Sequence, residues 1–211
     1  MEYYNEIDKL IEKAIKKYRP IYPASTSIQS RRLDFKSREV ILEYNSVILK
    51  DKIRIVIEYY LDKVFKQPNK VVFYFKIKEN NKEKVIEYKR ETTYPVKPIV
   101  VEDIIEHCLE RLEDKLIYEE NKIIEKEIVK QFEEIGLPVD YIEIRDPSEI
   151  DVGIHLYEDD YINFRGYIDY NGKFVIEKVE IECVEETTKD IALKKIIPKL
   201  VEIITIFKLL A

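Results

Sequence analysis

Apolar residues recur along the chain with helical spacing in some segments. Residues 3–18 show this pattern, and Pro20 marks the end of that helix. A helix is also predicted over 51–65, because i, i+3, i+4 spacing explains more positions than a strand based on alternating isoleucines. A long helix is predicted at about 100–135, with a break near Lys115–Glu119 as an alternative, and it ends at Gly136. A last helix is predicted at about 189–209, kinked at Pro198.

Runs rich in β-branched and aromatic residues predict strands between these helices. Residues 31–36 and 38–48 form a hairpin with a tight turn near Ser37-Arg38, and a second hairpin turns at Asn80-Asn81. Three or four strands follow, from the segments 139–144, 150–157, 161–169 and 173–184. The order predicts an α+β or α/β fold in which helices flank a mixed β-sheet. The segment from Tyr94 to Pro98 divides 1–96 from a second α+β lobe at 97–211, unless the chain is one continuous domain.

Composition and charge bound the classes of function. With 45% hydrophobic and 37% charged residues, the 211-residue chain is a globular protein rather than a disordered one. No apolar run is long enough for a membrane span, and the N-terminus lacks a signal-peptide layout. Two distant cysteines then favour reduced thiols in a cytoplasmic protein. Abundant Lys, Glu and Ile with no Trp is typical of hyperthermophile proteins.

The net charge of −6 is unevenly distributed. Residues 1–100 carry 22 basic and 14 acidic side chains, a net +8, whereas the remainder carries 14 basic and 28 acidic, a net −14. This asymmetry indicates that the first half binds a polyanion such as DNA. The alternative is that two oppositely charged lobes attract each other.

The first hairpin holds the strongest candidate for chemistry. A turn near Ser37-Arg38 would place Asp34 opposite Glu43 on one face, with side chains about 5 Å apart. Two carboxylates that close favour Mg²⁺ between them, which would polarise a phosphodiester, and Arg31 and Arg32 would hold the flanking phosphates. The ordinary alternative makes Asp34 a turn former and Glu43 a solvated strand residue.

The order of elements over residues 1–92 resembles the PD-(D/E)XK, or restriction-endonuclease-like, superfamily and its archaeal Holliday-junction resolvases. The resemblance implies a nuclease-like core with Asp34 and Glu43 as metal ligands and a helix acid at Glu12 or Glu6. Asn45 occupies the signature lysine position, and Lys36 would supply the charge from the neighbouring strand. The resemblance also implies an endonuclease that uses Mg²⁺ or Mn²⁺, acts on duplex or branched DNA and forms a homodimer. Size and composition also resemble nuclease-like proteins of spindle-shaped archaeal viruses, which would place it in host cytoplasm.

A second-choice site lies in the acidic half. The run EKEIVKQFEEIGLPV followed by SEIDVG is similar to the resolvase helix and aspartate-bearing strand, which selects Glu125 and Asp151. The competing hypothesis is a catalytically inactive nuclease-fold protein that serves as a nucleic-acid- or protein-interaction module. A purely structural homo-oligomer is a third class.

Overall fold

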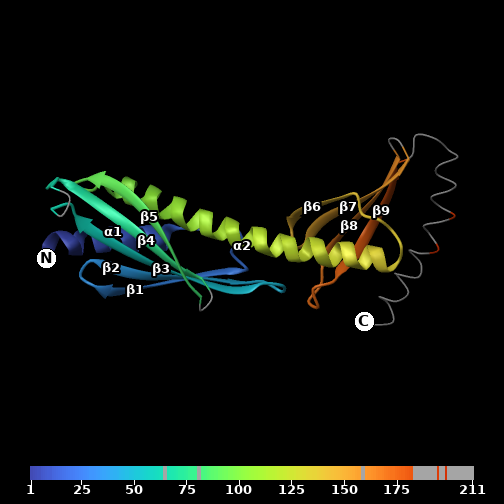
Figure 1. Ribbon diagram of the computed structural model, residues 1–211, viewed down its shortest axis with the longest axis horizontal. Coiled ribbons are helices and arrows are strands. Elements are labelled where there is room, and N and C mark those ends of the chain that lie inside the picture. Colours follow the sequence, from blue (N-terminus) through green and yellow to red (C-terminus); the bar gives the residue numbers. More distant parts are fainter. Residues whose placement is uncertain (64–65, 80–81, 158–159, 183–193, 195–197, 199–211) are drawn as a thin grey trace. The chain divides into compact units, whose positions relative to one another are not determined.

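The computed structural model describes residues 1–63, 66–79, 82–157, 160–182, 194 and 198 (Figure 1). Its elements in chain order are α1 (Glu2–Lys17), β1 (Thr26–Asp34), β2 (Ser37–Asn45), β3 (Lys50–Leu61), β4 (Lys70–Glu79), β5 (Lys82–Thr93), α2 (Pro98–Glu134), β6 (Tyr141–Asp146), β7 (Glu149–Tyr157), β8 (Asp160–Ile168) and β9 (Phe174–Glu182). The described strands form two antiparallel sheets with orders β1-β2-β3-β4-β5 and β6-β7-β8-β9, so the predicted α+β fold is confirmed. The predicted Asn80-Asn81 turn, and nearly all of the predicted helix at 189–209, lie outside the described residues.

The chain divides into two compact units, Met1–Glu119 and Glu120–Ala211, called unit 1 and unit 2 below. The helix α2 contributes its first part to unit 1 and its second part to unit 2. It runs from Pro98 to Glu134 without the break that was considered near Lys115–Glu119. Gly136 follows it with a positive φ of 69°, the left-handed conformation that commonly terminates helices.

The prediction of a helix over 51–65 is wrong, because Lys50–Leu61 is the strand β3. Ile53, Ile55 and Ile57 are all buried, and they alternate with the less buried residues Arg54 and Val56. In the sheet, β3 pairs with β2 on one side and β4 on the other. A strand buried on one face requires period-two alternation, and this tertiary requirement outweighs the local helical spacing.

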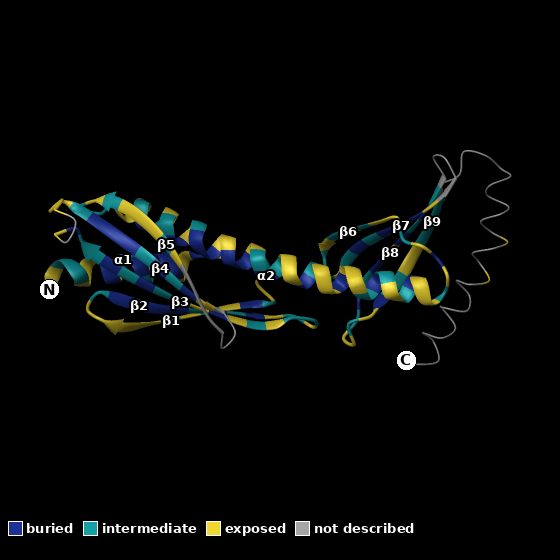
Figure 2. Cartoon of the chain, viewed as in Figure 1, coloured by how far each residue is buried: buried dark blue, intermediate teal, exposed yellow. Residues whose placement is uncertain are grey.

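The sheet β1–β5 has an inner face that packs against both helices of unit 1. Val40, Leu42, Ile55 and Phe75 lie on this face and share one core with the apolar residues of α1 and the first part of α2 (Figure 2). The opposite side is called the outer face below. It presents the alternate residues of each strand, which are mainly charged or tyrosine: Arg31, Glu39, Glu43, Lys52, Arg54, Glu58, Tyr60, Tyr74, Lys76, Lys78, Glu87, Lys89 and Glu91.

In unit 2 the sheet β6–β9 packs one face against the second part of α2. The ring of Phe132 on α2 lies 5.1 Å from that of Phe164 on β8, at an interplanar angle of 73°. Two glycines allow close approach within this sheet. A Cβ at Gly153 would lie 1.9 Å from the ring of Tyr141, and one at Gly166 would lie 2.0 Å from the carbonyl oxygen of Val175.

Candidate functional site

Asp34 closes the tight turn between β1 and β2. The turn residues are Phe35 and Lys36, and Asp34 pairs with Ser37 across it. The Asp34 Oδ1 accepts a hydrogen bond of 2.8 Å from the backbone N–H of Lys36. Burial alone would raise the pKa of Asp34, but hydrogen bonds from Lys36 and Ser37 and the Lys36 charge hold it below its ordinary value. These bonds are those of a turn-forming aspartate.

Glu43 lies at the other end of β2. It pairs with Ser27 of β1 and Lys52 of β3, and its Oε1 lies 2.5 Å from the Lys52 Nζ. The prediction that Asp34 faces Glu43 is therefore wrong. The turn comes two residues earlier than predicted, so Asp34 pairs with Ser37, about 20 Å along the strand from Glu43 at its usual rise per residue.

The resemblance to PD-(D/E)XK nucleases implies Mg²⁺ or Mn²⁺, but the residues assigned to it do not fit one ion. Mg²⁺ takes its ligands at about 2.0–2.1 Å, so two carboxylates separated by about 20 Å along the β1–β2 hairpin cannot share it. Within the described part of the chain, no three His, Cys, Asp or Glu side chains converge as a metal site. We derive no reaction step through a metal at Asp34 and Glu43.

The three predicted basic residues near the hairpin have separate partners. The Arg31 Nε donates to Glu39 at 2.7 Å. Arg32 donates from Nη2 to the Asn5 side chain at 2.9 Å and from Nε to the carbonyl oxygen of Asp34 at 2.8 Å. The Lys36 ammonium lies 4.3 Å from the centre of the Tyr60 ring, within the range of a cation–π contact. Arg31 and Lys36 therefore make their contacts on the outer face, whereas Arg32 links the hairpin to α1.

A buried ion pair that the sequence patterns missed joins α1 to the sheet. Arg38 on β2 donates to both carboxylate oxygens of Asp8, from Nε at 3.0 Å and from Nη2 at 3.1 Å. The Tyr59 hydroxyl donates to the same carboxylate at 3.2 Å. Burial, followed by the charge of Asp8, raises the pKa of Tyr59, so the phenol stays protonated. A charged residue at an inward position of both α1 and β2 was the signal that could have identified it.

The predicted helix acid, Glu12, belongs to the edge of this cluster. Its carboxylate lies 2.9 Å from the Lys16 Nζ and 3.5 Å from the Arg38 Nη2. The hydrogen bond from Lys16, and then the charges of Lys16 and Arg38, lower the pKa of Glu12. Glu12 therefore forms ion pairs with two side chains of the same unit, Lys16 and Arg38.

A second buried acid, Glu113, lies where α2 meets the start of β1. It is fully buried and accepts hydrogen bonds from the Tyr18 hydroxyl at 2.8 Å, the Thr26 hydroxyl at 3.1 Å and the Tyr22 backbone N–H at 3.1 Å. Three donors from three segments of the chain converge on this carboxylate. The contacts link α1, the following loop and β1 to α2, a structural role.

The second-choice pair, Glu125 and Asp151, is not brought together. Glu125 is an exposed residue of α2. Asp151 lies on the face of the β6–β9 sheet opposite the one that packs on α2, because it alternates with buried Ile150 and Val152. The Asp151 carboxylate accepts a hydrogen bond of 2.8 Å from the Arg165 Nε, so it is part of a surface ion pair.

Cys108 on α2 is not an activated nucleophile. Burial raises the pKa of its thiol to about 12, although the charges of Arg90 and Arg111 act in the opposite direction. A thiol with that pKa stays protonated at neutral pH, and thiolates rather than thiols are nucleophilic.

Comparison of the chain with protein-family models, curated proteins and solved structures gave no match. Among the residues that the structure describes, no helix combines the length and apolar character that a membrane crossing needs.

Proposed function

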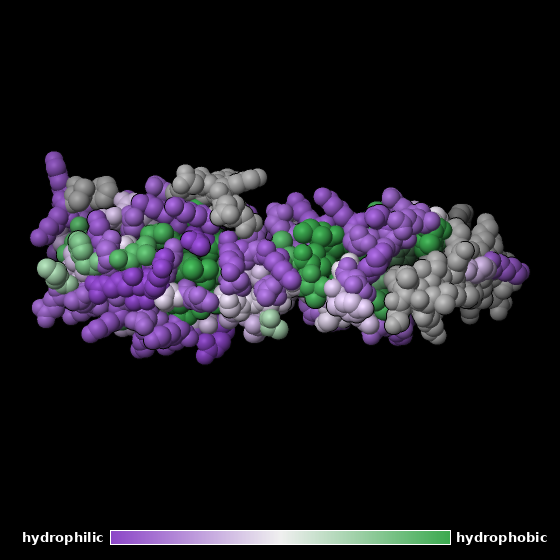
Figure 3. All heavy atoms as spheres, turned by 90° about the horizontal axis from the view of Figure 1, so that it is seen from below, coloured by the Kyte–Doolittle hydropathy of each residue, from purple (hydrophilic) through white to green (hydrophobic). Residues whose placement is uncertain are grey.

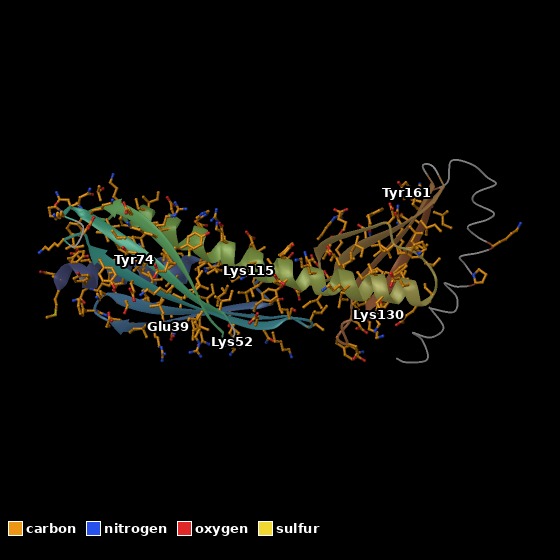
Figure 4. All side chains as sticks on the ribbon, viewed as in Figure 1. Glu39, Lys52, Tyr74, Lys115, Lys130 and Tyr161 are labelled. Atoms are coloured by element: carbon orange, nitrogen blue, oxygen red, sulfur yellow. The ribbon has the colours of Figure 1, made fainter. Side chains whose placement is uncertain are left out.

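We propose that unit 1 is a non-catalytic nucleic-acid-binding module and that the outer face of its β1–β5 sheet contacts a single strand. This surface combines exposed cations with tyrosine rings on an open sheet, the two features with which proteins hold single strands. Hydrophilic side chains predominate where Figure 3 looks onto β1–β3, and Figure 4 labels Glu39 on β2, Lys52 on β3 and Tyr74 on β4.

Within most of the described ion pairs of the outer face the cation is the more exposed partner, with Lys70–Glu91 as the exception. The Arg31 side chain is 69% exposed and that of Glu39 10%, while the corresponding values for Lys52 and Glu43 are 58% and 30%. The carboxylates thus lie lower on the sheet and hold the cationic groups outward. A polyanion approaching this face would meet positive charge first.

The observation that carries the proposal is a pair of cations directly opposite each other. Arg54 of β3 pairs with Lys78 of β4, and both are exposed. Neither has a carboxylate at salt-bridge distance among the described residues. Like charges opposite each other destabilise a sheet, and a bound phosphate would remove that repulsion. Lys52 and Lys76 lie two residues away along the same strands and extend the positive surface.

Two tyrosines on the same face provide surfaces for base stacking. The rings of Tyr60 and Tyr74 are 5.8 Å apart at 78°. Stacking of bases on aromatic rings is sequence-tolerant and is worth about 1–3 kcal/mol per base. The proposal includes no cleavage step, because Asp34 and Glu43 lie far apart along the β1–β2 hairpin. A homodimer stays a prediction.

The test is fluorescence anisotropy with a labelled oligothymidine of about twenty nucleotides, a length that exceeds the span of a typical single-strand site. Arg54→Gln/Lys78→Gln removes the opposed cations. The matched control, Lys9→Gln/Lys13→Gln, removes two exposed charges from α1, which packs on the other side of the sheet.

We expect the wild-type protein to bind at low salt and the Arg54/Lys78 variant to bind about tenfold more weakly or worse, because two phosphate contacts are lost. The control variant should bind like wild type, and EDTA should leave binding unchanged. Equal weakening by both double variants would contradict the proposed surface. Tighter binding of duplex DNA than of the single strand would contradict the proposed ligand.

A further inference from the structure

A cavity of about 240 Å³ lies in unit 1 between the inner sides of β4 and β5 and the first part of α2. It is larger than the ~150 Å³ apolar cavity that admits benzene in an engineered protein. All of its lining residues belong to the described part of the chain. The cavity opens on the side of the sheet opposite the proposed nucleic-acid surface.

The interior of the cavity is apolar. Phe75 and Ile77 of β4 line one side, and Ile104, Cys108 and Leu112 of α2 line the other. The Cys108 thiol stays protonated because burial raises its pKa, so it adds no negative charge. An uncharged apolar wall of this kind favours a hydrocarbon or aromatic group over water.

The remaining lining residues place nitrogen donors around this apolar interior. The nitrogen donors belong to Arg90 of β5 and to His107, Arg111 and Lys115 of α2, and Tyr88 of β5 adds a hydroxyl. Figure 4 labels Lys115. Among the residues that the structure describes, no acidic side chain lines the cavity. The site therefore complements a molecule with an apolar body and a negative group.

Arg111 is held at the cavity by Tyr88. Its Nη1 donates to the Tyr88 hydroxyl at 2.7 Å, and its guanidinium lies 5.8 Å from the centre of the Tyr88 ring. One guanidinium edge is thus engaged while other N–H donors stay available. A guanidinium held in place loses less side-chain entropy when it binds a carboxylate, and its fork matches the two oxygens.

A shallower neighbouring hollow indicates which end of the cavity takes the charge. This hollow shares Arg90 and His107 with the cavity but is also lined by Glu91 and Asp103. Those carboxylates would repel an anion. Arg111 does not line this hollow and is therefore the main partner of the negative group, while Arg90 adds a second positive charge from β5.

We infer that this cavity binds a small amphipathic carboxylate, with its apolar body against β4 and α2 and its carboxylate at Arg111 and Arg90. The inference is independent of the nucleic-acid proposal, since the two surfaces lie on opposite sides of one sheet.

The test is isothermal titration calorimetry of the full-length protein with octanoate, with octan-1-ol and with inorganic phosphate. Arg90→Gln/Arg111→Gln removes the proposed carboxylate partners. The matched control, Lys126→Gln/Lys130→Gln, removes two exposed charges from the second part of the same helix. Ile104→Phe reduces the cavity without a change in charge, and circular dichroism confirms that each variant is folded.

Octanoate should bind saturably and more tightly than octan-1-ol or phosphate alone. Arg90→Gln/Arg111→Gln should weaken octanoate at least about tenfold, because hydrogen bonds to charged groups are the stronger kind. Ile104→Phe should abolish binding, and the lysine control should not change it. Equal affinity for octanoate and octan-1-ol, equal affinity for octanoate and phosphate, unchanged octanoate binding in Ile104→Phe, or no octanoate binding would each overturn the inference.

Discussion

Replacement of Arg38 by Met should destabilise unit 1 more than any surface substitution. The Arg38 and Asp8 side chains are 6% and 8% exposed. Without the guanidinium, the Asp8 carboxylate would keep, among the described residues, the Tyr59 hydroxyl at 3.2 Å and the partly exposed Arg32 at 3.7 Å. Breaking one side of a buried pair costs about 3–5 kcal/mol, because a charge is left without compensation.

The reciprocal variant, Asp8→Leu, should cost less. Arg38 would keep Glu12 at 3.5 Å and the Ser30 hydroxyl at 3.3 Å as acceptors. The double variant Asp8→Leu/Arg38→Met should cost about 1–3 kcal/mol, because only the buried Tyr59 hydroxyl loses its acceptor. The double variant is therefore expected to be more stable than Arg38→Met alone.

The assay is urea denaturation with amide hydrogen exchange read on peptides from β2 and β3, which reports on unit 1 specifically. Lys52→Met is the control, because Lys52 forms a largely exposed pair with Glu43 on the outer face and should change the free energy of unfolding by less than about 1 kcal/mol. If the double variant lost as much free energy of unfolding as the two single variants together, the buried pair would not be the origin of the effect.

Three further predictions concern other contacts. Glu113→Ala should destabilise unit 1 by about 1–3 kcal/mol for each hydrogen-bond donor left without an acceptor, and Glu113→Gln by much less, as measured by urea denaturation. Gly166→Ala should lower the melting temperature of unit 2 more than Gly153→Ala, because the first clash is with backbone and the second with a movable tyrosine ring; calorimetry that ranks them in reverse would refute this. Since burial and the Asp8 charge raise the pKa of Tyr59 above 10.0, its contribution to stability is complete below pH 10 and lost as pH rises further. Urea midpoints at about pH 9 and about pH 11 should therefore differ less in Tyr59→Phe than in wild type.

The fold class and most elements could be predicted because their signals are local. The helix at 3–18 and the four strands after residue 138 follow from periodicity and turn residues, and the structure has them within a few residues. The strand β3 could not be recognised as readily, since its apolar residues satisfy two periods at once. Pairing with β2 and β4 selects the strand, and that pairing is not visible in its own sequence.

The candidate site was less predictable, because register and long-range contacts decide it. A shift of the turn to Phe35-Lys36 separates Asp34 from Glu43 along the hairpin. The Asp8–Arg38 pair joins residues 30 positions apart in different elements, so no motif spacing reveals it. The excess of positive charge in the first half was visible from composition. The position of Arg54 directly opposite Lys78 depends on the register between β3 and β4.

The salt dependence of oligothymidine binding tests the proposed surface most directly. Each phosphate contact on a single strand contributes about −0.7 to the slope of log K against log salt concentration. The proposal predicts that Arg54→Gln/Lys78→Gln reduces the magnitude of this slope by about 1.4, while Lys9→Gln/Lys13→Gln leaves it unchanged. An unchanged slope in the Arg54/Lys78 variant would contradict the assignment of the outer face as the nucleic-acid-binding surface.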